Sequence, residues 1–386
     1  DALNAMTGQE VWKTPTINAA MGDALVESIH GRPVVFVGAG DAGFTLQHAQ
    51  DFAHHGRPPG PTVRGANYSA IYAINGENGK ILWRFLTPGE DMPTPVYHDG
   101  LLFFSNGDGQ LDALNAVSGQ LVSSFANPGF SSMSSANWII PQSGPYQGQF
   151  LVIYGTQDPN ELMAVDENNP VQPQLAWTYK IPHSVNTGAG DVPPVVDPQT
   201  DEVITDSLVN DIAQGGTARH KILNLDIFAI NAATGQPIWS HLGGNGLVRR
   251  PPAFKGSLPM VHGNSVYVGD LLNESYQAYN VQTGQQEWET SLAKPGEINE
   301  PRAGSVYYDH RLLLAQGHHI YTINPQTGAI VNTFGVRGYY FGAWGIASPV
   351  IISGELYMGS ISGWVFAAPA SYVMTHRGHR LNQPLL

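Results

Sequence analysis

The stretch Ala229-Ile-Asn-Ala-Ala-Thr-Gly-Gln-Pro-Ile-Trp239 decides the fold. Asn231 starts a tight turn by hydrogen-bonding its own backbone, and Gly235 accepts a positive φ, so the residues on either side join as two antiparallel strands. Trp239 follows the glycine by four residues and lies on the outer strand, where its ring can pack against a neighbouring sheet. One copy of this pattern would indicate only a hairpin.

The pattern recurs along the whole chain. Other clear copies end at Trp12, Trp83 and Trp288, weaker copies span 113–123 and 322–332, and a stretched copy spans 164–177. A second apolar run precedes each turn, and before it comes a short strand that proline often introduces. Repetition of one such unit is typical of propellers, in which each four-stranded sheet is a blade. The sequence therefore predicts an all-β propeller of four-stranded antiparallel blades.

The number of blades depends on the first residues. Residues 1–5 resemble the third strand of a blade without a first or second strand before them. This overhang favours eight blades and an N-terminal part of the first blade that is missing from the sequence. Seven blades result if residues 10–13 close the last blade instead. We expect a single propeller domain over residues 1–386, with inserted loops at about 41–66 and 209–224, and loops of this length are usually functional or disordered.

The composition excludes several classes of function. Charged residues make up 13% of the chain, about half of the ~25% that is usual for soluble domains. The net charge of −13 argues against a nucleic-acid surface. No cysteine is present, so disulfides, thiolate metal sites and cysteine nucleophiles are excluded. No apolar run approaches the roughly 18 residues that span a membrane.

The repeat Ala-x-Asn/Asp-x-x-Thr-Gly-x-x-x-Trp resembles the tryptophan-docking repeat of propellers of the pyrroloquinoline-quinone (PQQ) type, over essentially the whole chain. Quinoprotein alcohol dehydrogenases of this type carry PQQ and calcium and typically a disulfide between adjacent cysteines, which this chain lacks. Scaffold propellers of the outer-membrane assembly type are similar in size. Tetrathionate hydrolases of acidophilic sulfur-oxidising bacteria share the repeat without using the quinone, and the low charge, absent cysteine and loop insertions fit this group best.

Resemblance to the third group implies an enzyme that hydrolyses tetrathionate to thiosulfate, sulfur and sulfate at acidic pH. It also implies a periplasmic or extracellular location and no cofactor. The alternatives are a non-catalytic scaffold of the outer-membrane assembly type and a PQQ- and calcium-dependent dehydrogenase. In each case we expect no nucleic-acid partner and no membrane span. A second subunit could complete a pocket beneath the second insertion, so a homodimer is one arrangement to consider.

The connections between blades place the candidate site. Connections from the outer to the inner strand share one face with both insertions, and residues just before an inner strand lie nearest the axis. This places Arg250, Arg302, Asp191 and Trp344 in a central pocket. Asp206 and Asp211 lie where a strand runs into the second insertion. The simpler interpretations are a solvated pair for Arg249 and Arg250, an ion pair of Arg302 with Glu300, turn caps for the loop aspartates and a core position for Trp344.

The chemistry of tetrathionate suggests a role for each residue. The substrate is a dianion with a sulfonate at each end, and guanidinium groups bind such groups by paired hydrogen bonds. We therefore expect Arg250 and Arg302 to bind the sulfonates, with Arg249 and Trp344 beside them. A carboxyl group suits proton transfer at acidic pH, because the ordinary pKa of aspartate is about 3.9. We expect Asp211 to activate water, with Asp206 or Asp191 as alternatives. We expect no metal, because no third ligand is spaced to assist His54 and His55.

Overall fold

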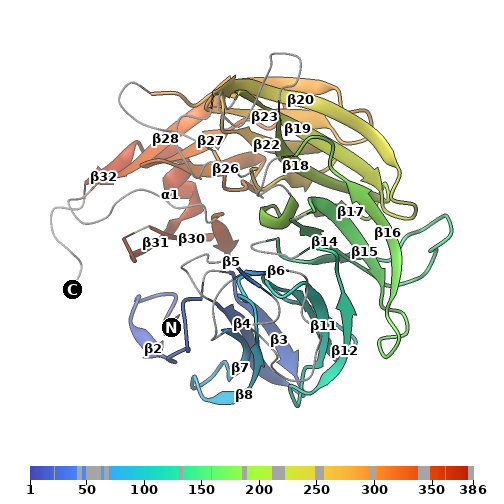
Figure 1. The fold of residues 1–386 in the computed structure, drawn as a ribbon. Helices are drawn as coiled ribbons and strands as arrows, with labels where there is room; N and C mark the ends of the chain where they lie inside the picture. Colours follow the sequence, from blue (N-terminus) through green and yellow to red (C-terminus); the bar gives the residue numbers. More distant parts are fainter. Residues whose placement is uncertain are drawn as a thin grey trace. The chain divides into compact units, whose positions relative to one another are not determined.

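The structure, a computed structural model, is built almost wholly from β-strands. It describes residues 1–20, 22–40, 46–48, 62–64, 69–129, 134–157, 159–184, 189–210, 222–247, 256–294, 301–337, 348–360 and 362–380. By internal contacts the chain divides into two compact units, Asp1–Val203 with Ile230–Pro237 and Ile204–Ala229 with Ile238–Leu386. Within each unit the strands of a sheet lie side by side in chain order (Figure 1).

The first unit begins with a two-stranded hairpin, β1 (Ala2–Leu3) and β2 (Glu10–Trp12), followed by three four-stranded antiparallel sheets. The first of these sheets contains β3 (Leu25–Ile29), β4 (Arg32–Ala39), β7 (Ser69–Asn75) and β8 (Ile81–Thr87), with the ribbon β5 (Leu46–His48) and β6 (Thr62–Arg64) inserted between β4 and β7. The second contains β9 (Val96–His98), β10 (Leu101–Ser105), β11 (Gln110–Asn115) and β12 (Leu121–Ala126). The third contains β13 (Asn137–Ile139), β14 (Leu151–Thr156), β15 (Glu161–Asp166) and β16 (Gln174–Lys180), and the short 3-10 helix η2 (Ala189–Asp191) follows it.

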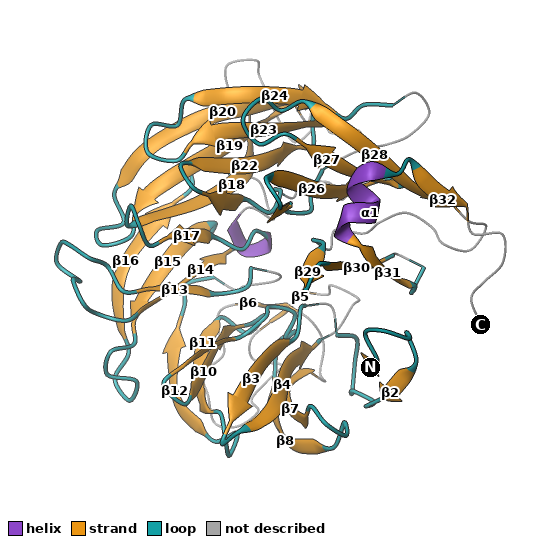
Figure 2. Ribbon diagram, turned by 180° about the vertical axis from the view of Figure 1, so that it is seen from behind, coloured by secondary structure: helices purple, strands orange, loops and turns teal. Residues whose placement is uncertain are grey.

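A fourth sheet has strands in both units: β17 (Val195–Asp197), β18 (Glu202–Asn210), β19 (Ile222–Asn231) and β20 (Pro237–Leu247). The second unit continues with β21 (Met260–His262), β22 (Ser265–Asp270), β23 (Ser275–Asn280) and β24 (Gln286–Ser291). The next sheet contains β25 (Val306–Tyr308), β26 (Arg311–Gln316), β27 (His319–Ile323) and β28 (Ile330–Arg337), and β32 (Gly378–Arg380) joins the edge of β28 in parallel. The last sheet contains β29 (Val350–Ile352), β30 (Glu355–Gly359) and β31 (Val365–Pro369). Helix α1 (Ala370–Thr375) follows β31 and packs on β28 (Figure 2).

The prediction of an all-β propeller of four-stranded antiparallel blades is confirmed, but the favoured count of eight blades is wrong. The described residues form seven blade sheets. Residues 1–12 do pair as strands, yet they form only the β1–β2 hairpin, and no described strand completes a blade beside it. Parts of the predicted insertions are described, namely the β5–β6 ribbon and the ends of β18 and β19; the rest lies outside the described residues.

The docking tryptophans join neighbouring sheets as the repeat predicts. Each of five indole Nε1 atoms donates a hydrogen bond to a backbone oxygen just after the turn asparagine of the next sheet. The five bonds are Trp12 to Gly76 (2.9 Å), Trp83 to Ala116 (3.0 Å), Trp177 to Ala232 (2.7 Å), Trp239 to Val281 (2.7 Å) and Trp288 to Pro325 (2.8 Å). The turn glycine of the next sheet lies against the ring, as Gly235 does at Trp177. Aromatic rings of this size bury large apolar areas, so the docks hold the sheets together as well as aligning them.

Two positions of the repeat lack the tryptophan. By strand pairing these are Ser123, opposite Ala113, and Asn332, opposite Thr322. Asn332 finds a replacement partner within the second unit, because its Nδ2 donates to the carbonyl oxygens of Val373 (2.8 Å) and His376 (2.7 Å) at helix α1. The helix therefore occupies the place of a docked neighbour, with Val373 fully buried against the sheet.

Candidate functional site

One position in the second strand of each blade identifies an unusual residue. In six sheets the backbone N–H that follows the turn asparagine, or its equivalent, donates a hydrogen bond to a carbonyl oxygen at the start of the second strand or just before it. The residue five positions after the one that carries this carbonyl is equivalent in all six sheets. These residues are Gly38, Ser105, Gly155, Asp206, Gly269 and Gly359. Strand pairing adds Ala315 as the seventh. Asp206 is therefore the single large, ionisable residue among seven otherwise small ones.

Close packing explains the glycine at several of these positions. A Cβ atom on Gly155 would collide with the carbonyl oxygen of Ala189, and one on Gly269 would collide with that of Pro301. The segment that enters the next sheet thus passes directly over this position. At Asp206 the entering segment turns donors toward the strand instead, since Ser257 N–H donates to Oδ1 (3.0 Å) and Oδ2 (3.2 Å). The Ser257 hydroxyl also donates to Oδ2 at 2.7 Å.

Burial sets the protonation of Asp206. Its side chain is fully buried on β18. Burial raises the pKa of Asp206 to about 7, because the charged carboxylate loses its hydration. The Ser257 hydrogen bonds and the positive charge of Arg302 lower this pKa, while the negative charge of Asp270 raises it. The carboxyl is consequently neutral in acidic surroundings and becomes ionised near pH 7.

Asp270 supports the same region from β22. Its carboxylate is fully buried and accepts hydrogen bonds from the backbone N–H of Leu272 (2.8 Å) and from Asn273 Nδ2 (2.6 Å). Burial raises the pKa of Asp270 as well. Gly244 on β20 lies so near this carboxylate that a side chain there would collide with it.

Arg302 completes the group from the segment before β25. It follows Pro301, whose carbonyl oxygen packs on Gly269, and its own carbonyl oxygen accepts a hydrogen bond from Leu258 N–H (2.9 Å). Three successive sheets of the second unit thus contribute a carboxyl (Asp206), a second carboxylate (Asp270) and a guanidinium (Arg302). A guanidinium beside a carboxyl that is neutral at acidic pH can attract an anion there.

The predicted site residues have different outcomes. The structure brings Asp206 and Arg302 into one electrostatic neighbourhood. Asp191 lies buried on η2 and belongs to the first unit. Asp211, Arg249, Arg250 and Trp344 lie outside the described residues, so their roles stay predictions. Sequence reasoning missed Ser257 and Asp270. Aligning the second strands of the blades would have marked Asp206 as the exception.

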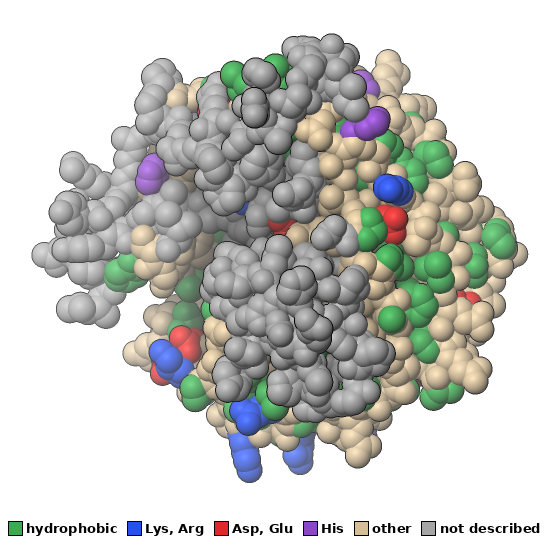
Figure 3. Space-filling view, in the orientation of Figure 1, with side chains coloured by type: hydrophobic (Ala, Val, Ile, Leu, Met, Phe, Trp, Pro, Cys, Tyr) green, Lys and Arg blue, Asp and Glu red, His purple; other side chains and the backbone are tan. Residues whose placement is uncertain are grey.

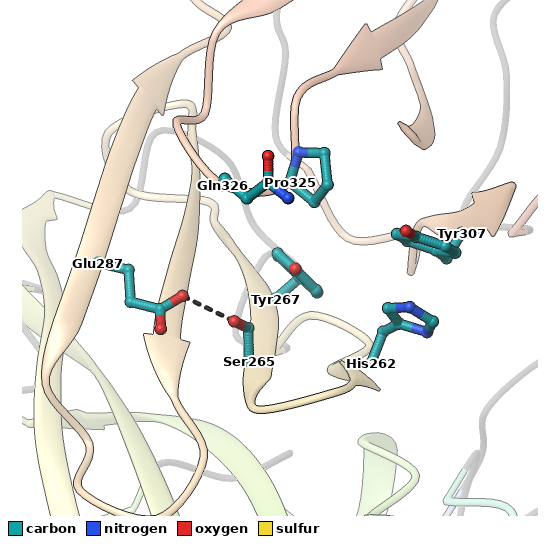
Figure 4. A pocket seen from close by; sticks show the side chains of 7 residues that line it. All are labelled: His262, Ser265, Tyr267, Glu287, Tyr307, Pro325 and Gln326. Atoms are coloured by element: carbon teal, nitrogen blue, oxygen red, sulfur yellow. Dashed lines mark hydrogen bonds between the residues drawn. The ribbon is translucent and has the colours of Figure 1, made fainter. Parts of the chain in front are cut away.

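A separate pocket of about 260 Å³ lies elsewhere in the second unit, lined by residues of β21, β22, β24 and β25 and of the β27–β28 turn (Figure 4). Its walls are His262, Ser265, Tyr267, Glu287, Tyr307, Pro325 and Gln326. Ser265 donates to Glu287 Oε2 at 2.7 Å, and His262 stacks on Tyr307 with ring centroids 3.5 Å apart. None of the predicted site residues lines this pocket, and it contains a single carboxylate.

The described residues show few other features of a binding surface. Their charged side chains are scattered over the face drawn in Figure 3. Among them, no three histidines, aspartates or glutamates gather closely enough to hold a metal ion. No helix in the described part of the chain is long and apolar enough to cross a membrane.

A family model described as outer membrane protein assembly factor BamB matches residues 1–217 and 223–370. The chain belongs to this family of PQQ-like β-propellers. Within the family, the chain is 33% identical to a tetrathionate hydrolase of Acidithiobacillus ferrooxidans over 95% of this chain and 68% of that protein. It is 31% identical to a tetrathionate hydrolase of Acidianus ambivalens over 96% of this chain and 67% of that protein. The resemblance to PQQ-like propellers, and among them to tetrathionate hydrolases, is therefore confirmed.

Solved structures support the same fold for this PQQ-like propeller. BamB from Moraxella catarrhalis matches it with a TM-score of 0.58 at 14% sequence identity, over 93% of this chain and 86% of that one. At this level of identity the likeness concerns the fold alone.

Proposed function

We propose that this PQQ-like propeller hydrolyses tetrathionate in acidic surroundings. The observation that carries the proposal is the ionisable Asp206 at a position where six other blades have glycine, serine or alanine, together with Arg302 in its electrostatic reach. Identity to two tetrathionate hydrolases over nearly the whole chain supports the choice of substrate. We further propose that the protein acts in the periplasm or outside the cell, where its surroundings can be acidic.

The reaction sets clear demands on the protein. One tetrathionate dianion and one water give a thiosulfate dianion, one sulfur atom, a sulfate dianion and two protons. The substrate is anionic at every pH of interest, so a cation must hold a sulfonate. The attacking water must also lose its protons to a base, and a carboxylate with an ordinary aspartate pKa of about 3.9 serves at acidic pH.

We assign these tasks to residues on and beside β18. Arg302 binds a sulfonate by charge-assisted hydrogen bonds, and Arg249, Arg250 and Trp344 remain proposed neighbours of the substrate. Asp211, the residue directly after the end of β18, is the proposed general base, and Asp191 is the alternative. Asp206 is fully buried, so we assign it a positioning role rather than contact with the substrate. When Asp206 is neutral at acidic pH, the Arg302 guanidinium can bind a sulfonate of the substrate. When Asp206 is ionised, its carboxylate competes with the sulfonate for Arg302.

The direct test is incubation of the purified protein with tetrathionate at about pH 3, where an aspartate of ordinary pKa near 3.9 is partly ionised. We expect loss of tetrathionate and formation of thiosulfate without any added cofactor. A parallel sample with PQQ and calcium should show neither faster turnover nor a bound quinone chromophore. A protein that leaves tetrathionate intact under all these conditions would instead favour the non-catalytic scaffold, and a quinone spectrum would favour the dehydrogenase.

A further inference from the structure

The dock between the β9–β12 and β13–β16 sheets differs from the five intact tryptophan docks. Ser123 on β12 takes the place of the docking tryptophan, because it pairs with Ala113 as Trp177 pairs with Ala164. On the other side of the dock, Glu167 takes the position that Ala116 and Ala232 hold in intact docks. Its backbone N–H donates to Phe150 O (3.0 Å), as the N–H groups of Ala116 and Ala232 donate to Gly100 O and Asp201 O. Both halves of the dock have therefore changed together.

The altered dock buries polar atoms at the place where a tryptophan ring packs in the intact docks. Glu167 is only 3% exposed, yet neither of its carboxyl oxygens has a hydrogen-bond partner among the described residues. The Ser123 hydroxyl is likewise buried and without a partner there. Buried polar groups are normally satisfied, so each exception calls for an explanation. Asn332, at the other position that lacks the tryptophan, differs from Ser123 in this respect. Helix α1 supplies two carbonyl partners for its side chain.

Among the described residues, the one charge that shifts the pKa of Glu167 is the negative charge of Asp166. The surrounding strands carry Asp166 and Glu161 on β15, Tyr154 on β14, Asp112 on β11 and His98 on β9. Lys180 on β16 pairs opposite Glu161, at the end of β15 farther from Glu167. The negative charge of Asp166 opposes a second negative charge on Glu167. Phe150, stacked on His98 with centroids 3.9 Å apart, makes the neighbourhood more apolar.

We propose that the altered dock between the β9–β12 and β13–β16 sheets, called the seam below, acts as a pH-sensitive latch. The seam is closed while Glu167 is neutral and opens locally when Glu167 loses its proton. A neutral carboxyl tolerates burial, whereas an ionised one without a partner must regain water. Only opening of the seam supplies that water. Burial first, and the charge of Asp166 second, raise the pKa of Glu167 to about 8, so the latch responds between mildly acidic and alkaline pH. The inference is independent of the proposed hydrolysis.

Amide hydrogen exchange of the seam tests this latch. If the open form has an ordinary carboxyl pKa of about 4.3, protection of the peptides covering β12 and the β15–β16 turn falls up to about tenfold per pH unit between about pH 5 and 8. That fall is expected after correction for the intrinsic pH dependence of exchange. Glu167→Gln and Glu167→Ala should both abolish it. Alanine is native at two intact docks, so the second variant is compatible with the fold.

Two controls make the outcome decisive. Glu202→Gln removes another buried carboxyl of the first unit and should leave the pH response of the seam unchanged. Peptides at the intact Trp288 dock, which lies in the second unit away from Glu167 and Glu202, should show no change in their pH response in any variant. If the seam peptides of the unmodified protein and of both Glu167 variants respond alike to pH, the latch does not exist.

Discussion

Replacing Arg302 by methionine is expected to lower kcat/KM for tetrathionate by about 10²- to 10³-fold, within the range of about 2–5 kcal/mol that truncating one partner of a buried, hydrogen-bonded charge pair costs. Methionine keeps much of the length and bulk of the side chain but supplies no charge. Most of the loss should appear as a higher KM, because the sulfonate is already anionic in the bound substrate. Steady-state kinetics at about pH 3 measure the effect; ordinary aspartates are partly ionised there.

Two further variants separate charge from packing. Arg302→Lys keeps the charge without the paired donors, so its activity should lie between those of the methionine variant and the unmodified protein. Arg311→Met removes a guanidinium of the same unit that donates to His310 O, away from the proposed site, and should leave kinetics unchanged. Activity of Arg302→Met within about threefold of normal would exclude sulfonate binding by Arg302, since such a change is under 1 kcal/mol.

The free energy of unfolding is expected to fall as the pH rises from about 5 to 8. Burial raises the pKa of Glu167 to about 8 and those of Glu202 and Asp206 to about 7. The folded state therefore holds these protons more tightly than the unfolded state does. Unfolding releases protons between the two pKa values, so raising the pH favours unfolding. Each such group contributes about 1.4 kcal/mol per pH unit within its window.

Denaturant unfolding at several pH values measures this slope. The stability is complete below the unfolded carboxyl pKa of about 4 and is lost as the pH passes through 7 to 8. Glu167→Gln and Glu202→Gln should each flatten the decline, whereas Glu77→Gln, at an exposed turn position between β7 and β8, should not. A maximum of stability near neutral pH would show that these buried carboxyls do not control the pH dependence.

The sequence was informative where its repeat was regular. The Asn-x-x-Thr-Gly pattern with its tryptophan predicted the paired strands and the docks correctly, because turn chemistry and ring packing act locally. The blade count failed because residues 1–12 satisfy the local pattern, which does not reveal whether further strands complete a sheet. The helix that accepts hydrogen bonds from Asn332 was not foreseen either, because that contact joins residues about 40 positions apart.

The candidate site was only partly predictable for a similar reason. Arg302 was nominated from its place before an inner strand, and Asp206 from its place before an insertion. The preference for Asp211 over Asp206 ignored burial, which raises the pKa of Asp206 but has no signature in a single sequence. Ser257 becomes recognisable only in the structure, because its hydrogen bonds join it to Asp206 across 51 residues of sequence.

The pH profile of Asp206→Asn tests the central claim most directly. Asparagine is uncharged at every pH, like the neutral acid; its Oδ1 can accept the Ser257 N–H hydrogen bond, and its Nδ2 can donate to the Ser257 hydroxyl in place of the bond that Oδ2 accepted. In the unmodified protein, kcat/KM should decline above about pH 7 as Asp206 ionises beside Arg302. The variant should keep its activity at acidic pH and lose that decline, so that it exceeds the unmodified protein by about tenfold one pH unit above the Asp206 pKa. A variant that is inactive at all pH values, or that shows an unchanged profile, would contradict the account.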